Sequence, residues 1–227
     1  MVEEKKGKKE ESKKEKEEEK IEKKKNEEEI LIFGKYSSNV TIEDPTIAQY
    51  ISLQPVYFPH SHGRHAKQYL GKARVNLIER LANKLMRGGT GEKIGGKVIR
   101  TEGRLQGKKT KVLKIIKEAF EIIEERTKQN PIQLLVKAVE NSAPREDVTR
   151  VEYGGVMYPV AVDISALRRV NVALRNIALA AIIKAFGNKK TISEALAEEI
   201  ILASSNDPNS YAVKRKDEIE RIARSAR

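Results

Sequence analysis

Three histidines, the only ones in the chain, lie within six residues in the segment PHSHGRH, at positions 60, 62 and 65. Clustered imidazoles are common metal ligands. This segment, however, contains no carboxylate or thiol, and no helix places two of the rings at i and i+4. Arg64 and Lys67 lie beside the rings, so the residue types favour a loop that contacts phosphate groups. We therefore predict phosphate contacts from Arg64 and Lys67, and no metal site.

A second segment, GEKIGGKV at residues 91–98, comes within one residue of the P-loop pattern. Val98 stands where a P-loop needs the hydroxyl that holds Mg²⁺, and the segment follows an amphipathic helix instead of a buried strand. NTPase activity is therefore not expected. The glycines still allow close approach to a phosphate, so the Gly- and Lys-rich linker after Gly88-Gly89 is either a cradle for an RNA backbone or a flexible loop. The cations of this linker are Lys97, Arg100, Arg104, Lys108, Lys109 and Lys111.

Catalytic patterns are missing from the rest of the sequence. It contains no G-x-S-x-G, no H-E-x-x-H, and no G-x-G-x-x-G after a strand. The acidic residues mostly alternate with lysines at the spacing of exposed helix faces. The absence of cysteine excludes disulfides, thiol catalysis and cysteine-based zinc sites. We predict a protein that is not an enzyme and binds no cofactor.

The charge of the chain points to a polyanionic partner. Its 227 residues carry a net charge of +12. Residues 1–30 contain 11 Lys and 12 Glu, so residues 31–227 alone carry +13. Such a balance indicates nucleic acid first and an anionic membrane second. No run approaches the roughly 18 apolar residues of a membrane span, and the charged N-terminus lacks an apolar signal core. We expect a cytoplasmic protein.

Hydrophobic periodicity divides the chain into three parts. Residues 1–30 have almost nothing to bury and predict a disordered or loosely helical tail, either solvated or acting as a docking arm. Residues 31–66 predict an extension with short extended segments. Residues 67–227 predict one helical domain. Its six helices are expected from Arg74 to Leu85, around 112–123, after the Asn130-Pro131 cap, from Ser165 to Gly187, after a capping box at Thr191, and at 212–227. The fold class is therefore mainly α.

One β-hairpin interrupts these helices, at about residues 148–163. Gly154-Gly155 fits a two-residue turn, and the flanks are rich in β-branched and aromatic residues. No third strand is adjacent in the sequence, so the ribbon either projects as an arm or lies flat on the helices. We favour an arm, because arginines at its base suit a partner with phosphates. These arginines are Arg145, Arg150, Arg168, Arg169 and Arg175.

The segments around the hairpin carry a resemblance that extends over residues 58–227. In order and with similar intervals, the chain resembles the family of small-subunit ribosomal protein seven. The PHSHGRH segment and the long N-terminal region are similar to its archaeal and eukaryotic branch. The matching segments are LANKLMRGG, AFEIIEERTKQNP, AVENSAPREDVTRV, AVDISALRRVNVALRN, KTISEALAEEII and NSYAVKRKDEIERIARSAR.

The resemblance implies a helical bundle with a protruding ribbon that binds the 3′ major domain of small-subunit rRNA and nucleates assembly of the head. It implies an rRNA surface at Arg74, the 97–111 linker, the hairpin root, Arg168 and Arg169. The ribbon tip, Gly154-Gly155, and Lys214, Arg215 and Lys216 would face the mRNA exit channel and the exit-site tRNA. Neighbouring proteins of the head and platform would be further partners. Glu152 and Tyr153 depart from the more positive tip of many family members, which disfavours phosphate contacts there.

Two other classes of function stay open from the residues alone. A DNA-binding or nucleoid protein could use an arginine-rich helix and a β-ribbon, and preference for duplex DNA over structured RNA would favour it. An RNA-modifying enzyme would need a catalytic set that the sequence does not contain. The leading hypothesis is a ribosome-bound, structural rRNA-binding protein.

Overall fold

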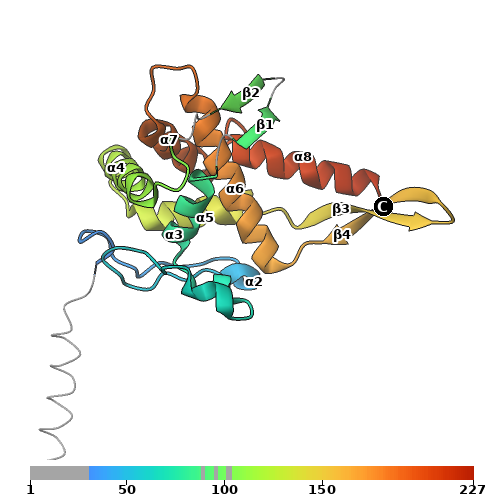
Figure 1. The fold of residues 1–227 in the computed structure, drawn as a ribbon, viewed down its shortest axis with the longest axis horizontal. Coiled ribbons are helices and arrows are strands. Elements are labelled where there is room, and N and C mark those ends of the chain that lie inside the picture. Colours follow the sequence, from blue (N-terminus) through green and yellow to red (C-terminus); the bar gives the residue numbers. More distant parts are fainter. Residues whose placement is uncertain (1–30, 88–89, 95–96, 101–103) are drawn as a thin grey trace, which may run out of the picture.

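A computed structural model describes residues 31–87, 90–94, 97–100 and 104–227 (Figure 1). The charged tail predicted at residues 1–30 lies outside these residues. The boundaries at residues 30 and 66 stay predictions. Within the described part of the chain, no helix is long and apolar enough to cross a membrane.

The fold is mainly helical, as the sequence predicts, and all six expected helices are present. They are α3 (Leu77–Leu85), α4 (Lys109–Thr127), α5 (Pro131–Ser142), α6 (Ala166–Ala185), α7 (Ile192–Ser204) and α8 (Tyr211–Ser225). A four-residue helix, α2 (Pro45–Ala48), and two 3₁₀ turns, Arg64–Lys67 and Gly71–Arg74, precede them.

Local sequence signals set several helix ends. The Asn130 side chain accepts a hydrogen bond from the Ile132 amide, with Pro131 in the first turn, and Thr191 and Glu194 form the predicted capping box. The first long helix begins later than the pattern predicts. Its cap is Asn76, whose side chain accepts from the Ile78 amide, and Arg74 belongs to the preceding 3₁₀ turn.

Helix α6 passes through the middle of the bundle and packs against α3, α5, α7 and α8 (Figure 1). Because helices surround it, α6 buries residues on most of its circumference. Alanines let neighbouring helices approach it closely. Those that are buried are Ala173, Ala178, Ala180 and Ala181.

The N-terminal extension shares the core of the helices. Phe33 and Tyr36 both pack edge-on against Phe120 of α4, with ring centroids 6.1 and 5.9 Å apart. Ile47 of α2 is fully buried in the same core. The Tyr36 hydroxyl donates to Glu124 at 3.1 Å, and burial together with this carboxylate raises the pKa of Tyr36. The extension is thus an integral layer of the body.

The predicted hairpin projects as an arm. Strands β3 (Glu146–Tyr153) and β4 (Val156–Asp163) pair antiparallel, and Gly154 and Gly155 both have positive φ, 60° and 79°, which glycine adopts without strain. Residues 149–160 are all exposed, so the alternative of a ribbon lying flat on the helices is wrong. In Figure 1 the ribbon extends beyond the end of α8.

A second ribbon forms where the sequence predicts only a linker. Strand β1 (Thr90–Ile94) pairs antiparallel with β2 (Lys97–Arg100), with an irregularity between Thr90 and Lys93. The prediction of an unstructured linker is therefore wrong for these residues. In the sequence a Gly-Gly pair again separates the two strands. The sequence does not predict these strands, because they are short and contain frequent lysine and glycine.

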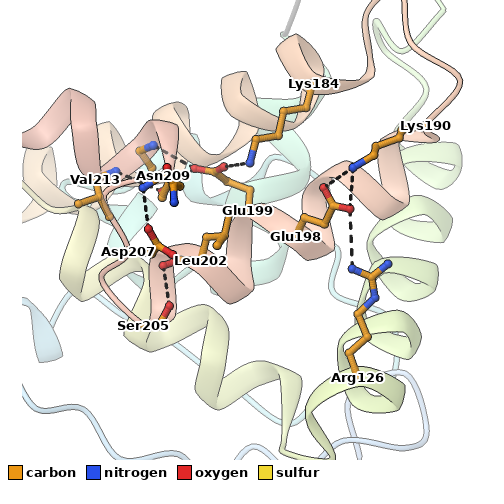
Figure 2. A network of polar contacts seen from close by, with 12 residues as sticks. Arg126, Lys184, Lys190, Glu198, Glu199, Leu202, Ser205, Asp207, Asn209 and Val213 are labelled. Carbon is orange, nitrogen blue, oxygen red and sulfur yellow. Dashed lines mark hydrogen bonds and ion pairs between the residues drawn. The ribbon is translucent and has the colours of Figure 1, made fainter.

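A buried carboxylate fixes the position of α8. Glu199 of α7 is 0% exposed and accepts from the Lys184 ammonium at 2.6 Å, from the Ser210 hydroxyl at 2.7 Å and from the Ala212 amide at 3.0 Å. Figure 2 shows Lys184 and Glu199 pointing toward each other. The same carboxylate thus joins α6, α7 and the start of α8, the helix that carries Lys214 and Lys216.

Candidate nucleic-acid interface

A group of cations gathers where α3 meets α6. Arg80, Lys84 and Arg87 follow the spacing i, i+4, i+7, which places them on one side of α3 and its C-terminal continuation. Lys72 of the second 3₁₀ turn and Arg175 of α6 lie close enough to affect the same charges. We call these five residues the α3 cation cluster: Lys72, Arg80, Lys84, Arg87 and Arg175.

Burial and neighbouring cations both act on the lysines of the α3 cation cluster. Burial, followed by repulsion from the other four cations, lowers the pKa of Lys84 to about 8. Burial and the guanidinium groups of Arg80 and Arg87 lower the pKa of Lys72. Among the residues that the structure describes, no carboxylate forms an ion pair with Lys72, Lys84 or Arg87. An external anion would relieve this repulsion.

Arg80 anchors the cluster from inside the protein. Its guanidinium donates to the Tyr50 carbonyl at 2.6 Å and to the Asn171 side chain at 3.4 Å. Its Nε is buried and has no acceptor among the described residues. Burial lowers the pKa of Arg80 to about 10. Arg80 is only 2% exposed, so its charge lies below the surface.

An open groove of about 650 Å³ runs between α6 and α8. It brings together Arg168 and Arg175, predicted for rRNA, with Lys214 and Arg215, predicted for the exit site. The groove is not purely basic, because Asp147 pairs with Arg168 at 3.2 Å and Glu218 pairs with Arg215. The side-chain amide of Asn176, in the groove wall, is buried and has no partner within the described residues.

The remaining predicted cations lie at several surfaces. Arg64 and Lys67 lie on the first 3₁₀ turn and Arg74 on the second, where it donates to Gln68 at 3.4 Å. Lys97 and Arg100 lie on β2. Several others are exposed around the start of α4 and the ribbon, and Lys216 is half-buried on α8. The exposed ones are Arg104, Lys108, Lys111, Arg145 and Arg150.

Two predicted RNA contacts are engaged within the protein instead. The Arg169 side chain is only 8% exposed and pairs with Asp44 at 2.9 Å. Lys109 pairs with the buried Glu79, which also accepts from the Ser61 hydroxyl at 2.7 Å. The Arg169–Asp44 pair ties the N-terminal extension to α6, and the Lys109–Glu79 pair ties α4 to α3. Arg169 and Lys109 thus already have carboxylate partners within the protein, and their predicted phosphate contacts stay predictions.

The histidines pack against one another and against the turn that carries them. The rings of His60 and His62 lie 4.1 Å apart, and His65 Nδ1 lies 3.1 Å from the Ser61 hydroxyl. Burial and the charges of Lys109 and His62 lower the pKa of His60. Within the described ranges, no group of three or more possible ligands could hold a metal ion. Phosphate contact by Arg64 and Lys67 stays a prediction.

Sequence reasoning missed four members of the α3 cation cluster, Lys72, Arg80, Lys84 and Arg87, and predicted only Arg175 for RNA. The signal that could have found Lys84 and Arg87 is their spacing from Arg80, which repeats at i, i+4 and i+7 opposite the apolar stripe. No local pattern connects Lys72 or Arg175 to them, because α6 meets α3 only in the folded chain.

A basic helical body with clustered cations and a projecting ribbon is the architecture expected of a structural nucleic-acid-binding protein. The family model for ribosomal protein S7p/S5e matches residues 47–227. The small ribosomal subunit protein uS7 of Archaeoglobus fulgidus is 50% identical over 199 residues, which cover 87% of this chain and 95% of that protein. The chain belongs to this ribosomal protein family, as the resemblance predicts.

Proposed function

We propose that this chain binds the 3′ major domain of small-subunit rRNA and nucleates assembly of the subunit head. As a member of its family, the chain is a structural component of the ribosome in the cytoplasm. The domain of rRNA and the role in assembly are the parts that require a test.

The single observation that carries the proposal is the α3 cation cluster. Several positive charges that repel one another, with no carboxylate paired to Lys72, Lys84 or Arg87 among the described residues, destabilise the free protein. Phosphate groups would relieve this repulsion and displace counterions, which is the main source of affinity in protein–nucleic acid binding. The cluster therefore supports RNA binding more specifically than the net charge does.

Other predicted cations would extend this contact. We infer that Arg64, Lys67 and Arg74 contact phosphates on one side of α3. The cations from Lys97 to Lys111, except Lys109, would contact phosphates on the other side. Arg168 and Arg175 would continue the surface onto α6, with Arg145 and Arg150 at the ribbon root. RNA shape and unpaired bases would supply specificity.

The ribbon tip and α8 form the second part of the proposal. We infer that Gly154-Gly155, Lys214, Arg215 and Lys216 lie near the mRNA exit channel and the exit-site tRNA. The projection of β3 and β4 beyond the helical body supports this location, because the tip reaches past the end of α8 (Figure 1). The tip would contribute by its shape, since Glu152 would repel phosphate.

The test is binding of the purified protein to the isolated 3′ major domain across a salt series, with the 5′ domain and duplex DNA as competitors. We expect tight binding that weakens steeply with salt and that neither competitor displaces at equal concentration. Equal competition by duplex DNA would contradict the proposal and favour a nucleoid protein. Equal competition by the 5′ domain would contradict the assigned rRNA domain.

A further inference from the structure

The groove between α6 and α8 has an apolar floor below a charged rim. Its volume of about 650 Å³ lies within the range of roughly 300–1,000 Å³ that is common for binding pockets. The charged lining residues are mostly exposed, whereas the apolar ones are buried or half-buried. The apolar floor consists of Pro144, Ile164, Val172, Leu179, Tyr211 and Ile219.

The rim of this groove is positive. Four cations and two carboxylates line it, a net charge of +2. Both carboxylates are already paired with arginines of the rim. Lys214 forms no ion pair among the described residues. Arg175 of the rim also belongs to the α3 cation cluster, so the groove continues the surface that we propose for phosphate contacts.

A buried amide donor without an acceptor borders the groove. Asn176 is 6% exposed and lines the groove, and its Nδ2 has no hydrogen-bond partner within the described residues. A buried donor that stays unpaired destabilises a fold, so this amide points to a ligand that supplies the acceptor. A carbonyl oxygen is such an acceptor, and uracil, guanine and cytosine each carry one on the base edge.

An unpaired nucleotide fits these features better than a peptide does. A base packs its flat faces on apolar and aromatic side chains such as Tyr211, and its edge hydrogen-bonds to polar groups. The phosphates on either side of the base would meet the positive rim. An apolar peptide would fill the floor but would leave the net charge of the rim without anions.

We propose that the groove between α6 and α8 holds one unpaired nucleotide of the 3′ major domain, whose base lies on the apolar floor and accepts a hydrogen bond from Asn176. The base is one that carries a carbonyl oxygen, and Arg175 and Lys214 contact the flanking phosphates. The inference rests on the proposed binding of this rRNA domain. It adds recognition of a base to a surface otherwise assigned to phosphates.

The salt dependence of RNA binding separates a base contact from a phosphate contact. Asn176→Leu removes the amide but keeps a side chain of similar size, so affinity for the 3′ major domain should fall about tenfold with an unchanged salt slope. The matched variant Lys214→Gln should instead lower the salt slope by about 1. Filter binding across a salt series measures both. An Asn176→Leu affinity equal to that of the wild type, or a lowered salt slope, would overturn the proposal.

A stability measurement separates base recognition from a structural role of Asn176. Replacing a buried amide that has no partner by an apolar side chain is neutral or stabilising. Urea denaturation should therefore give Asn176→Leu an unfolding free energy no lower than that of the wild type. A variant that loses stability and RNA affinity together would assign Asn176 to the fold and overturn base recognition.

Photo-crosslinking identifies the nucleotide. Benzoylphenylalanine replaces Leu179 in the groove or, as the matched control, Phe186 at the end of α6, which is 45% exposed and lies outside the groove lining. Both in the complex with the isolated 3′ major domain and in assembled subunits, position 179 should give an adduct with one unpaired rRNA nucleotide, at several times the yield of position 186. A protein or mRNA adduct at 179, or equal rRNA yields from both positions, would overturn the proposal.

Removing the base from the crosslinked nucleotide tests its link to Asn176. An abasic substitution there should weaken binding of the wild type about tenfold, but binding of Asn176→Leu only about twofold, because the variant has already lost the contact. Equal losses in the two proteins would show that Asn176 does not contact this base.

Failure of this inference and failure of the proposed function are distinguishable. If the wild-type chain does not bind the 3′ major domain, the proposed function fails and the inference fails with it. If the wild type binds this domain but Asn176→Leu binds equally well, only the inference is overturned.

Discussion

Cations of this protein occur in two opposite settings. Arg169 and Lys109 have carboxylate partners within the chain. The Arg169–Asp44 pair connects α6 to the N-terminal extension, and the Lys109–Glu79 pair connects α4 to α3. Lys84 of the α3 cation cluster lies among further cations, and burial together with these cations lowers its pKa to about 8. The difference teaches that net charge does not locate an interface. A cation with an internal partner stabilises the fold, whereas Lys72, Lys84 and Arg87, which form no ion pair among the described residues, remain available to an external anion.

The largest effect is expected from breaking a paired cation. Asp44→Ala leaves the buried Arg169 guanidinium without its carboxylate and removes the cap of α2. The free energy of unfolding should fall by about 3 kcal/mol, measured by urea denaturation. The salt dependence of RNA binding should not change, because the Arg169 side chain is only 8% exposed.

Glu43→Ala is the matched control for Asp44→Ala. This neighbouring carboxylate is exposed and lies 3.6 Å from the Lys137 ammonium, so its loss should cost about 0.5 kcal/mol or less. Equal losses in the two variants would show that burial of the Arg169 pair does not matter, and the contrast between the two settings would fail.

Charge reversal in the α3 cation cluster should weaken RNA binding without lowering the stability of the fold, the opposite of the effect of Asp44→Ala. The double variant Lys84→Glu/Arg87→Glu should bind the 3′ major domain about 30-fold more weakly at 0.1 M salt, with a salt slope lower by about 2. Its unfolding free energy should not fall, because repulsion is relieved. Filter binding and urea denaturation measure the two quantities.

The control for charge reversal is Lys35→Glu/Lys137→Glu, which changes the net charge equally at two exposed, paired lysines. We expect its RNA affinity to fall severalfold less than that of the cluster variant. If both variants weaken RNA binding equally, the affinity depends only on the total charge, and the special role of the α3 cation cluster is contradicted.

Raising the pH should increase the stability of the protein and decrease its RNA affinity. Both effects should be smaller than those of charge reversal. The pKa of Lys84 is lower in the folded protein than in the unfolded chain, so the folded state releases its proton first. Between pH 8 and 10 the free energy of unfolding should therefore rise, by on the order of 1 kcal/mol. RNA affinity should fall over the same range, because the ammonium loses its charge.

Lys84→Gln separates this residue from other groups that titrate at high pH. The variant should be more stable than the wild type at pH 7 and should show less of both pH effects. A wild-type pH profile that persists unchanged in the variant would assign the effect to other groups.

The smallest effect on folding should come from the ribbon. Deleting residues 152–158 removes exposed side chains only, so the unfolding free energy should stay within about 0.5 kcal/mol. Binding to the 3′ major domain should change less than twofold, while translational fidelity or initiation is impaired. Loss of the helical fold, seen by circular dichroism, would contradict the independence of the arm from the body.

The sequence predicts those features of this fold that depend on neighbouring residues. The Asn130-Pro131 cap, the Thr191 capping box and the Gly154-Gly155 turn each act within a few residues, and each is present. The pairing of Arg169 with Asp44 is different, since 125 residues separate the two. Arg175 is likewise brought to Lys84 only by the packing of α6 on α3. Long-range packing, which composition does not encode, thus decides which cations face outward.

The most direct test of this account is the reactivity of each lysine toward an acylating reagent near pH 8, read by mass spectrometry with and without the 3′ major domain. A lowered pKa leaves more neutral, nucleophilic amine, so Lys84 should react fastest in the free protein and become protected in the complex. Lys35, an exposed lysine paired with Glu121, should react equally in both states. If RNA protects Lys35 as much as Lys84, or leaves Lys84 unprotected, the α3 cation cluster is not the RNA contact.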